Sequence, residues 1–535
     1  MTAPSESAPP DDRRGWPVWT IPGLLTLAVT LAGIGHAQPW RDELATWSAA
    51  TRPVPDLVRL AGTIDAATGP YYLLMHGWTA LAGTSTTALR LPSALAMAGA
   101  AALTARLGAR LAGPRAGLLA GLLLAVLPAT SRYGQEARPY APATLLAVLA
   151  TLLLVGALRR PTWRRWAGYA AAVAALGLLH LIALTLLAAH AVVVLLAAGR
   201  GLAAAGVPPP PGLADGTPPE VATPSAPAEA TTGPGRTGAE RDGDREGRTR
   251  SATAARAGVL WRWLVALLPA VVLVAPLVLV AGGQRGRQLD WVRLVRVDDL
   301  AALPGALAQS GVVGGLLLGL AALGTARLGR RALLPGLAVL LPVLLLYAAG
   351  TVVPLWVTRY LIFTVPFACL LAGAALAGVR LVPALAVVTL AGLVGLPDQA
   401  ALRRTHEWPR TAPVDYAGVA RVVADHQRPG DAIVYSPRDS WLFPDLGLAY
   451  HLGARRPRDV LVVRDQRQRA DLWAAECGRP AECLAGVDRV WLVVTGRRAD
   501  PLAAVPGAKG DALRGAFTVR QVWPRPGLTV ALLTR

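Results

Sequence analysis

The sequence predicts an all-α polytopic membrane domain of about eleven spans, followed by a small α/β domain outside the membrane. Apolar stretches long enough to cross a bilayer recur from residue 17 to residue 397, and shorter amphipathic or β-rich stretches replace them from Asp398 onward. The composition agrees, because 53% hydrophobic residues are too many for an ordinary soluble chain of 535 residues.

The basic residues indicate how the chain is threaded through the membrane. The formal net charge of +20 alone would suggest nucleic acid as a partner, but the arginines interrupt apolar stretches and form no continuous basic face. Basic residues gather at the cytoplasmic ends of spans. Arg13 and Arg14 therefore make residues 1–16 a cytoplasmic tail, and the expected partner is membrane lipid, with no nucleic acid.

The length of the apolar stretches and the positions of the basic residues together define the predicted spans. An odd number of spans places the C-terminus outside the cell. The segment 166–198 is too long for one span, since its helical length would be roughly 50 Å against a ~30 Å hydrocarbon core. Basic residues flank it on both sides, so it is predicted as two short spans that meet near His180. The other predicted spans cover residues 17–37, 90–109, 116–130, 141–158, 258–281, 304–326, 332–350, 359–379 and 381–397.

The predicted domains follow the changes in composition. Residues 17–199 form a first membrane core with a large outer loop at 38–89, and residues 258–397 form a second membrane segment. Residues 200–257, rich in Pro, Gly, Glu and Arg, cannot bury a core and are predicted as a disordered cytoplasmic linker. Residues 398–535 form the α/β domain, with a helix at Val414 to His426 and strands at Asp431 to Tyr435 and Arg489 to Val494.

Cysteines and metal-ligand patterns give little further information. Cys477 and Cys483 fall in the outer domain, where a local disulfide is the preferred interpretation and two unpaired small residues the alternative. His406-Glu407 lacks the second histidine of a zinc protease motif. No cofactor is predicted, and a divalent metal stays open.

Polar residues collect in the loops that share the outer face. An apolar stretch, Tyr71 to Trp78, is too short to cross and is predicted as an interfacial helix in the loop 38–89. Taken singly, these polar groups are ordinary: an acidic dipeptide in a loop is usually solvated, and polar residues anchor helix ends. The groups on this face are Asp42 and Glu43, Asp65, His76, Gln135 to Arg138, and Arg359 with Tyr360.

Their convergence favours chemistry on a phosphate lipid. Such chemistry needs a carboxylate to accept a hydroxyl proton and guanidinium groups to hold the phosphate that leaves. A transporter would place charges near the midplane of the membrane, whereas the span interiors here are nearly free of charge.

An ordered set of motifs resembles the GT-C glycosyltransferases. The similarity is to bacterial relatives of protein O-mannosyltransferases and lipid A aminoarabinose transferases, as in glycosyltransferase family 39. Such enzymes take sugars from polyprenyl-phosphate donors, begin with a cytoplasmic N-terminus and carry an acidic motif in a first outer loop with interfacial helices. The motifs are Trp40 to Glu43, Gly69 to Trp78, Arg90 to Ser93, Gln135 to Tyr140, His180 and Thr358 to Leu361.

The resemblance assigns roles residue by residue. It implies Asp42 as the general base, Glu43 as its support or as an acceptor ligand, and Arg138 and Arg359 as phosphate contacts. Gly69-Pro70 stands where relatives often have two prolines, and His180 lacks the usual flanking Thr and Tyr, so the acceptor site stays open. The remaining predicted substrate-binding residues are Asp65, Tyr71, His76, Gln135, Glu136, Tyr140, His180 and Tyr360, with a structural role as the alternative for the two histidines.

The predicted function is an inverting hexosyl transfer, with mannose as the sugar by analogy, to an unidentified glycan, lipid or protein outside the cell. The absence of a Walker loop or GxGxxG fingerprint in its context disfavours a nucleotide-sugar donor. A lipid-linked sugar flippase or secondary transporter is the alternative, and a noncatalytic protein that displays residues 398–535 is a second one. The basic stretch Gln284 to Arg296 is either an outer amphipathic helix that binds anionic lipid or glycan, or a solvated loop.

Overall fold

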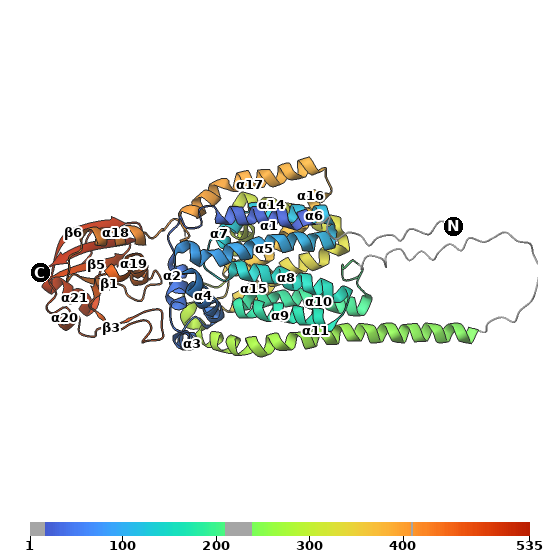
Figure 1. Cartoon of the computed structure of the whole chain (residues 1–535), viewed down its shortest axis with the longest axis horizontal. Helices are drawn as coiled ribbons and strands as arrows, with labels where there is room; N and C mark the ends of the chain where they lie inside the picture. The colour runs from blue at the N-terminus through green and yellow to red at the C-terminus, as the bar shows by residue number, and fades with distance from the viewer. Residues whose placement is uncertain (1–15, 209–237, 408–409) are drawn as a thin grey trace, which may run out of the picture.

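The computed structural model describes residues 16–208, 238–407 and 410–535. A bundle of long helices forms one end of the molecule, and an α/β domain forms the other (Figure 1). Each of the eleven predicted spans overlaps a helix. A helix is expected there because backbone N–H and C=O groups inside a bilayer have no water to bind and must pair within the segment. These helices are α1 (Trp16–Leu31), α5 (Thr86–Ala112), α6 (Pro114–Val126), α8 (Tyr140–Arg159), α9 (Trp163–Leu179), α10 (Leu186–Arg200), α11 (Gly238–Gln288), α14 (Gly311–Leu328), α15 (Leu333–Val352), α16 (Val365–Ala377) and α17 (Leu381–Arg404).

The number of membrane crossings is a separate question from the number of helices. Within the described ranges, seven segments are long and apolar enough to cross, or eight if α6 and the bent continuation α7 (Pro128–Gly134) count as one span. By this measure α14 and α15 count as one segment of 42 residues, although the 3₁₀ turn η4 (Gly329–Ala332) separates them. The predicted total of eleven crossings therefore stays a prediction.

The helical segment around His180 is broken at the predicted place. Helix α9 ends at Leu179, His180 is extended with φ −156°, and the 3₁₀ turn η3 (Leu181–Thr185) leads into α10. A second 3₁₀ turn, η5 (Thr358–Thr364), precedes α16. These two breaks lie together, since η3 and η5 are in contact.

Two helices extend beyond the predicted domain boundaries. Helix α11 begins at Gly238, so residues 238–257, predicted as disordered linker, are helical; their Glu, Arg and Ala residues are good helix formers. The rest of the predicted linker at 209–237 lies outside the described residues. Helix α17 continues to Arg404, past Asp398, because Pro397 is tolerated within an apolar helix whose neighbours satisfy its backbone.

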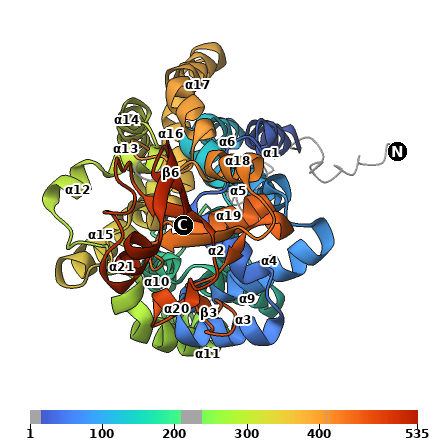
Figure 2. The ribbon, with the colours of Figure 1, turned by 90° about the vertical axis from the view of Figure 1, so that its left-hand side faces the viewer.

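The first outer loop folds into short helices between the bundle and the α/β domain (Figure 1). They are α2 (Arg41–Ala50), α3 (Val54–Thr63), the 3₁₀ turn η2 (Ala66–Thr68) and α4 (Gly69–Ala82), which contains the predicted helix at 71–78. Their apolar faces share one core with the α/β domain, where Leu44, Tyr72 and Met75 join Tyr416 and Trp491. Seen from the domain end, α19 (Pro444–Leu452) overlies α2, which it contacts (Figure 2).

The C-terminal domain is a mixed sheet with helices on both faces. The strand order is β2-β1-β5-β7-β6, with β1 parallel to β2 and β5, and β7 antiparallel to β5 and β6. Both faces of the central strands are buried, one against α18 (Tyr416–His426) and α19 and the other against α21 (Gly507–Ala516). The strands are β1 (Ala432–Ser436), β2 (Arg458–Asp459), β5 (Arg489–Thr495), β6 (Thr518–Arg525) and β7 (Leu528–Thr534), beside a small pair β3 (Val462–Arg464) and β4 (Ala475–Glu476).

The predicted helix and the two predicted strands of this domain are present as α18, β1 and β5. Cys477 and Cys483 form a disulfide between β4 and the short helix α20 (Pro480–Cys483). Cys369 is buried within α16, as a small packing residue would be.

Candidate active site at the outer face

A buried ion pair fixes the first turn of α2. Glu43 and Arg90 are each 1% exposed, and Arg90 binds the Glu43 carboxylate through two nitrogens, at 2.6 and 2.8 Å. Glu43 also accepts the backbone N–H of Ala137 at 2.9 Å, which joins the loop before α8 to α2. Burial opposes ionisation of Glu43, but the charge and hydrogen bonds of Arg90 outweigh it and hold the pKa of this carboxyl below its usual value.

Of the two roles predicted for Glu43, support of the site and binding of the acceptor, this pairing favours the first. Its carboxylate is enclosed and engaged by Arg90 and Ala137, so it positions the loop and cannot reach an acceptor. Adjacent residues on a helix point about 100° apart. Asp42 therefore faces elsewhere than Glu43.

Asp42 is the accessible carboxylate of the pair. Its side chain is 19% exposed, and its Oδ2 lies 3.5 Å from Nη2 of Arg359 and has no hydrogen-bond partner among the described residues. Arg359 lies in η5, and its Nε donates to the Tyr140 hydroxyl at 3.0 Å. The guanidinium also lies over the rings of Trp40 and Trp291, at 5.9 and 5.5 Å from their centroids. Arg359 is thus held beside Asp42 from several sides.

A second network surrounds Arg138. The Tyr72 hydroxyl donates to Asp65 and lies 3.4 Å from Nη1 of Arg138. Asp65 also accepts from Thr68 at 2.8 Å and from Gln288 of α11, and burial raises its pKa. Nε of Arg138 is buried without a partner in the described structure. Part of this guanidinium is therefore still available to an anion.

Aromatic rings line the breaks at His180 and η5. The Tyr140 ring meets His180 edge-on at 5.8 Å and stacks on Tyr360 at 6.4 Å. His180 also meets Tyr360 at 5.6 Å, and its Nδ1 is buried without a partner in the described structure. The structure therefore brings these three predicted residues together beside Arg138 and Arg359.

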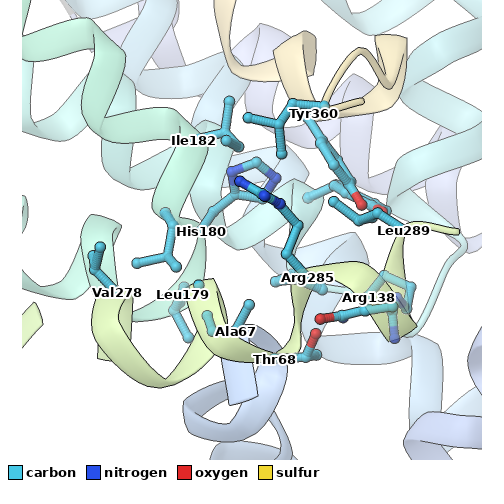
Figure 3. Close-up of a pocket in the computed structure, with 17 residues that line it drawn as sticks. Ala67, Thr68, Arg138, Leu179, His180, Ile182, Val278, Arg285, Leu289 and Tyr360 are labelled. Atoms are coloured by element: carbon cyan, nitrogen blue, oxygen red, sulfur yellow. The ribbon is translucent and has the colours of Figure 1, made fainter. Parts of the chain in front are cut away.

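Two cavities meet at this point. The first, of about 300 Å³, is lined by apolar residues of α9, η3 and α11, including Leu179, Ile182 and Val278. Arg138, Arg285, Tyr140 and His180 also line it; Figure 3 shows Arg285 and His180 pointing into the same space. The second cavity contains Asp42, Asp65 and Arg359. Both cavities are lined by Arg138, Gln288, Leu289 and Tyr360.

Four predicted substrate-binding residues, Tyr71, His76, Gln135 and Glu136, lie outside both cavities, and the first three serve the packing. Tyr71 is fully buried in the core that joins the outer loop to the α/β domain. His76 pairs through Nδ1 with the carbonyl of Ala50 at 3.0 Å, which ties α4 to the end of α2. Gln135 donates to the carbonyls of Thr30 and Ala32, both at 2.8 Å, and so anchors the end of α1.

Glu136 is one of two buried glutamates with a raised pKa among the described residues, and the other, Glu407, was not a predicted site residue. Glu136 lies 3.6 Å from Arg132, neither carboxylate oxygen has a hydrogen bond in the described structure, and burial raises its pKa to about 7. Glu407 is likewise buried, with its pKa raised to about 7. His406 lies 3.8 Å from Glu43, and burial lowers its pKa to about 3. The described residues contain no cluster of three or more His, Cys, Asp or Glu arranged to hold a metal.

Several residues of the cavities were not predicted. Arg285, Gln288 and Trp291 come from the basic stretch 284–296, which ends α11 and then forms an irregular segment at 289–296 instead of a separate amphipathic helix. Trp441, Phe443 and Leu472 reach the Asp42 cavity from the α/β domain. The only sequence signal for the first group was its basic composition, and there was none for the second.

The architecture defines a multi-pass membrane protein with a cavity for an amphipathic ligand at one end of its bundle. The apo crystal structure of ArnT from Cupriavidus metallidurans matches with a TM-score of 0.56 at 13% identity, covering 97% of this chain and 98% of that chain. The crystal structure of the same protein bound to undecaprenyl phosphate matches with a TM-score of 0.54 at 12% identity, over the same shares. These matches establish the GT-C fold.

The sequence itself supports a more particular relationship. Residues 69–206 match the family described as dolichyl-phosphate-mannose-protein mannosyltransferase. A search of the curated proteins found no match. The chain thus has the fold of ArnT, and residues 69–206 are similar to the mannosyltransferase family, in agreement with the motif resemblance.

Proposed function

We propose that this chain is a membrane glycosyltransferase that moves a sugar from a polyprenyl-phosphate donor to a hydroxyl outside the cell. The observation that carries the proposal is the junction of the two cavities. A mainly apolar cavity that also contains two arginines suits an isoprenoid phosphate, and it shares lining residues with the only cavity that holds Asp42 among those of the described residues. ArnT, whose fold is similar, is bound to undecaprenyl phosphate in its own crystal structure.

In the proposed reaction, an acceptor hydroxyl oxygen attacks the anomeric carbon of the donor sugar. The bond from this carbon to the phosphate oxygen breaks, polyprenyl phosphate leaves with the electron pair, and the hydroxyl proton goes to Asp42. Arg138 neutralises the phosphate, because its Nε lacks a protein partner and the residue lines both cavities. Arg285 is the second phosphate contact from the lipid side.

This assignment modifies the role expected for Arg359. Its guanidinium lies 3.5 Å from Asp42 and donates to Tyr140. It does not line the first cavity, which we name the lipid cavity. Its positive charge orients the Asp42 carboxylate. In the proposed mechanism Arg285, and not Arg359, contacts the phosphate together with Arg138, as predicted for Arg138.

Inversion at the anomeric carbon is part of the proposal. Asp65, the other carboxylate in the Asp42 cavity, is engaged by Tyr72, Thr68 and Gln288. A double displacement would need a second free carboxylate as a nucleophile. One accessible carboxylate supports a single displacement. Mannose as the sugar rests on the family matched by residues 69–206.

The test is donor consumption by the purified protein in nanodiscs with a short-chain polyprenyl-phosphate mannose, and with methyl α-D-mannopyranoside or water supplying the acceptor hydroxyl. Wild-type protein releases polyprenyl phosphate, and Asp42→Asn loses about 10²- to 10⁴-fold of this rate, the usual worth of a general base. Asp298→Asn, an exposed aspartate outside both cavities, is the matched control and keeps the wild-type rate. A flippase predicts no release, so intact donor after incubation with wild-type protein overturns the proposal.

A further inference from the structure

The α/β domain contributes a wall to the cavity that holds Asp42. Trp441, Phe443 and Leu472 line this cavity, opposite side chains that come from the membrane domain. Trp441 and Phe443 both pack on Trp473, with ring centroids 4.6 and 5.3 Å away. The three rings form one cluster, which we name the aromatic wall: Trp441, Phe443 and Trp473.

The aromatic wall is held rigidly from behind. Trp473 donates its indole N–H to the carbonyl of Ser440 at 3.1 Å, which ties its loop to the loop that carries Trp441. Phe443 has φ 48°, in the left-handed region, where a bulky residue persists only if its surroundings fix it. The backbone beside it is held by the Tyr416 hydroxyl, which donates to Leu442.

The membrane domain fixes the same loops from the other side. Arg287 of α11 binds the buried carboxylate of Asp471 at 2.8 Å and lies over the Trp473 ring at 5.3 Å. Arg52, which follows α2, is buried and donates to the Asp471 carbonyl at 2.8 Å. A domain that only displayed itself at the surface would need no such connection between its loops and the cavity.

The composition of the cavity is complementary to a pyranose ring. A pyranose has apolar C–H faces and a rim of hydroxyls, so it needs flat aromatic faces together with charged or amide groups. The aromatic residues Trp441, Phe443 and Trp291 line the cavity. Asp42, Arg138 and Gln288 supply hydrogen-bonding groups at its edges. A peptide backbone or an acyl chain would not require both kinds of group around so small a space.

We propose that the aromatic wall is a sugar-stacking subsite, so that the α/β domain completes the active site. This inference rests on the proposed function and specifies the ligand of its second cavity as a pyranose. The ring comes from the donor or from a glycan acceptor, and the two sources are distinguished by the experiment.

The experiment compares Trp441→Ala and Trp441→Phe with Trp523→Ala in full-length protein. Trp523 lies on β6 of the same domain and lines neither cavity, so it controls for loss of an indole. Three quantities are measured: the KM of polyprenyl-phosphate mannose in its hydrolysis without acceptor, the KM of methyl α-D-mannopyranoside as acceptor, and binding of this mannoside by saturation-transfer NMR. Trp441→Phe retains a flat face and provides a second variant if Trp441→Ala does not fold.

Trp441→Ala is expected to raise either the donor KM or the mannoside KM by about 10-fold, because this is the usual contribution of one aromatic contact and its buried area. The effect of Trp441→Phe should be smaller. A change in the donor KM assigns the ring to the donor, and a change confined to the mannoside KM and mannoside binding assigns it to a glycan acceptor. If both Trp441 variants match Trp523→Ala in all three quantities, the inference is overturned although wild-type turnover upholds the proposed function. If wild-type protein consumes no donor but Trp441→Ala loses mannoside binding, the subsite stands and the proposed function fails.

Discussion

The buried pair of Glu43 and Arg90 gives the most quantitative prediction, through the substitution Arg90→Leu. Arg90 donates to the Glu43 carboxylate and to the carbonyls of Ile34 and Ala37, both at 2.8 Å, and both members of the pair are 1% exposed. Leucine fills most of the space, but it leaves the buried Glu43 carboxylate with backbone donors alone and no countercharge from Arg90, and it removes the Arg90 donor from the carbonyls of Ile34 and Ala37. Breaking a buried pair on one side costs about 3–5 kcal/mol of unfolding free energy.

The pH dependence of this loss has a definite sign. The folded pKa of Glu43 lies below its unfolded value, so the pair stabilises the protein fully above the ordinary glutamate pKa. This stabilisation is lost as the pH falls below that value towards the lowered folded pKa. The difference in stability between wild type and Arg90→Leu is therefore largest at neutral pH and shrinks in acid.

The measurement is reversible denaturation of the purified protein in mixed micelles, at neutral pH and near pH 4. Arg59→Ala is the control, because Arg59 also pairs with an aspartate, Asp56, but is 57% exposed. The control should be indistinguishable from wild type. Equal stabilities of Arg90→Leu and the control at neutral pH would refute the assignment of Glu43 as a structural anchor.

Further predictions concern the residues around Asp42. Burial raises the folded pKa of Glu136 to about 7, so its contribution to stability falls as the pH rises from about 4.5 to about 7; the stability of wild type relative to Glu136→Gln should therefore fall over this range in the same denaturation assay. Tyr72→Phe removes the hydroxyl between Asp65 and Arg138 and should lower donor kcat/KM by roughly 10-fold, as expected for one hydrogen bond to a charged group, and an unchanged value contradicts this. His76→Ala should lose only about 1 kcal/mol of stability through its bond to α2 and retain wild-type donor turnover, so a large loss of turnover would restore His76 to the site.

The membrane architecture was largely predictable, because hydropathy and charge act locally along the chain. The break at His180 followed from length alone, since the apolar segment around it exceeds the thickness of a bilayer. The end of α17 was misplaced because Pro397 and Asp398 resemble a helix stop in water, whereas an apolar helix tolerates proline.

The site was predictable only in its acidic and arginine motifs. Glu43 and Asp42 are adjacent in sequence and equivalent in chemistry, and only the approach of Arg90 from α5 shows which carboxylate is occupied. The aromatic wall could not be predicted, because Trp441 lies about 400 residues from Asp42 and meets it only after the domain docks. Such contacts form only in the tertiary structure, so no local sequence pattern predicts them.

The central claim is that Asp42 takes a proton from an acceptor beside a bound polyprenyl phosphate. Single-turnover transfer from saturating polyprenyl-phosphate mannose separates chemistry from donor binding. Asp42→Asn should bind the donor as wild type does, since Asp42 does not line the lipid cavity, while its transfer rate falls by about 10²- to 10⁴-fold. A wild-type transfer rate in Asp42→Asn protein would contradict the mechanism.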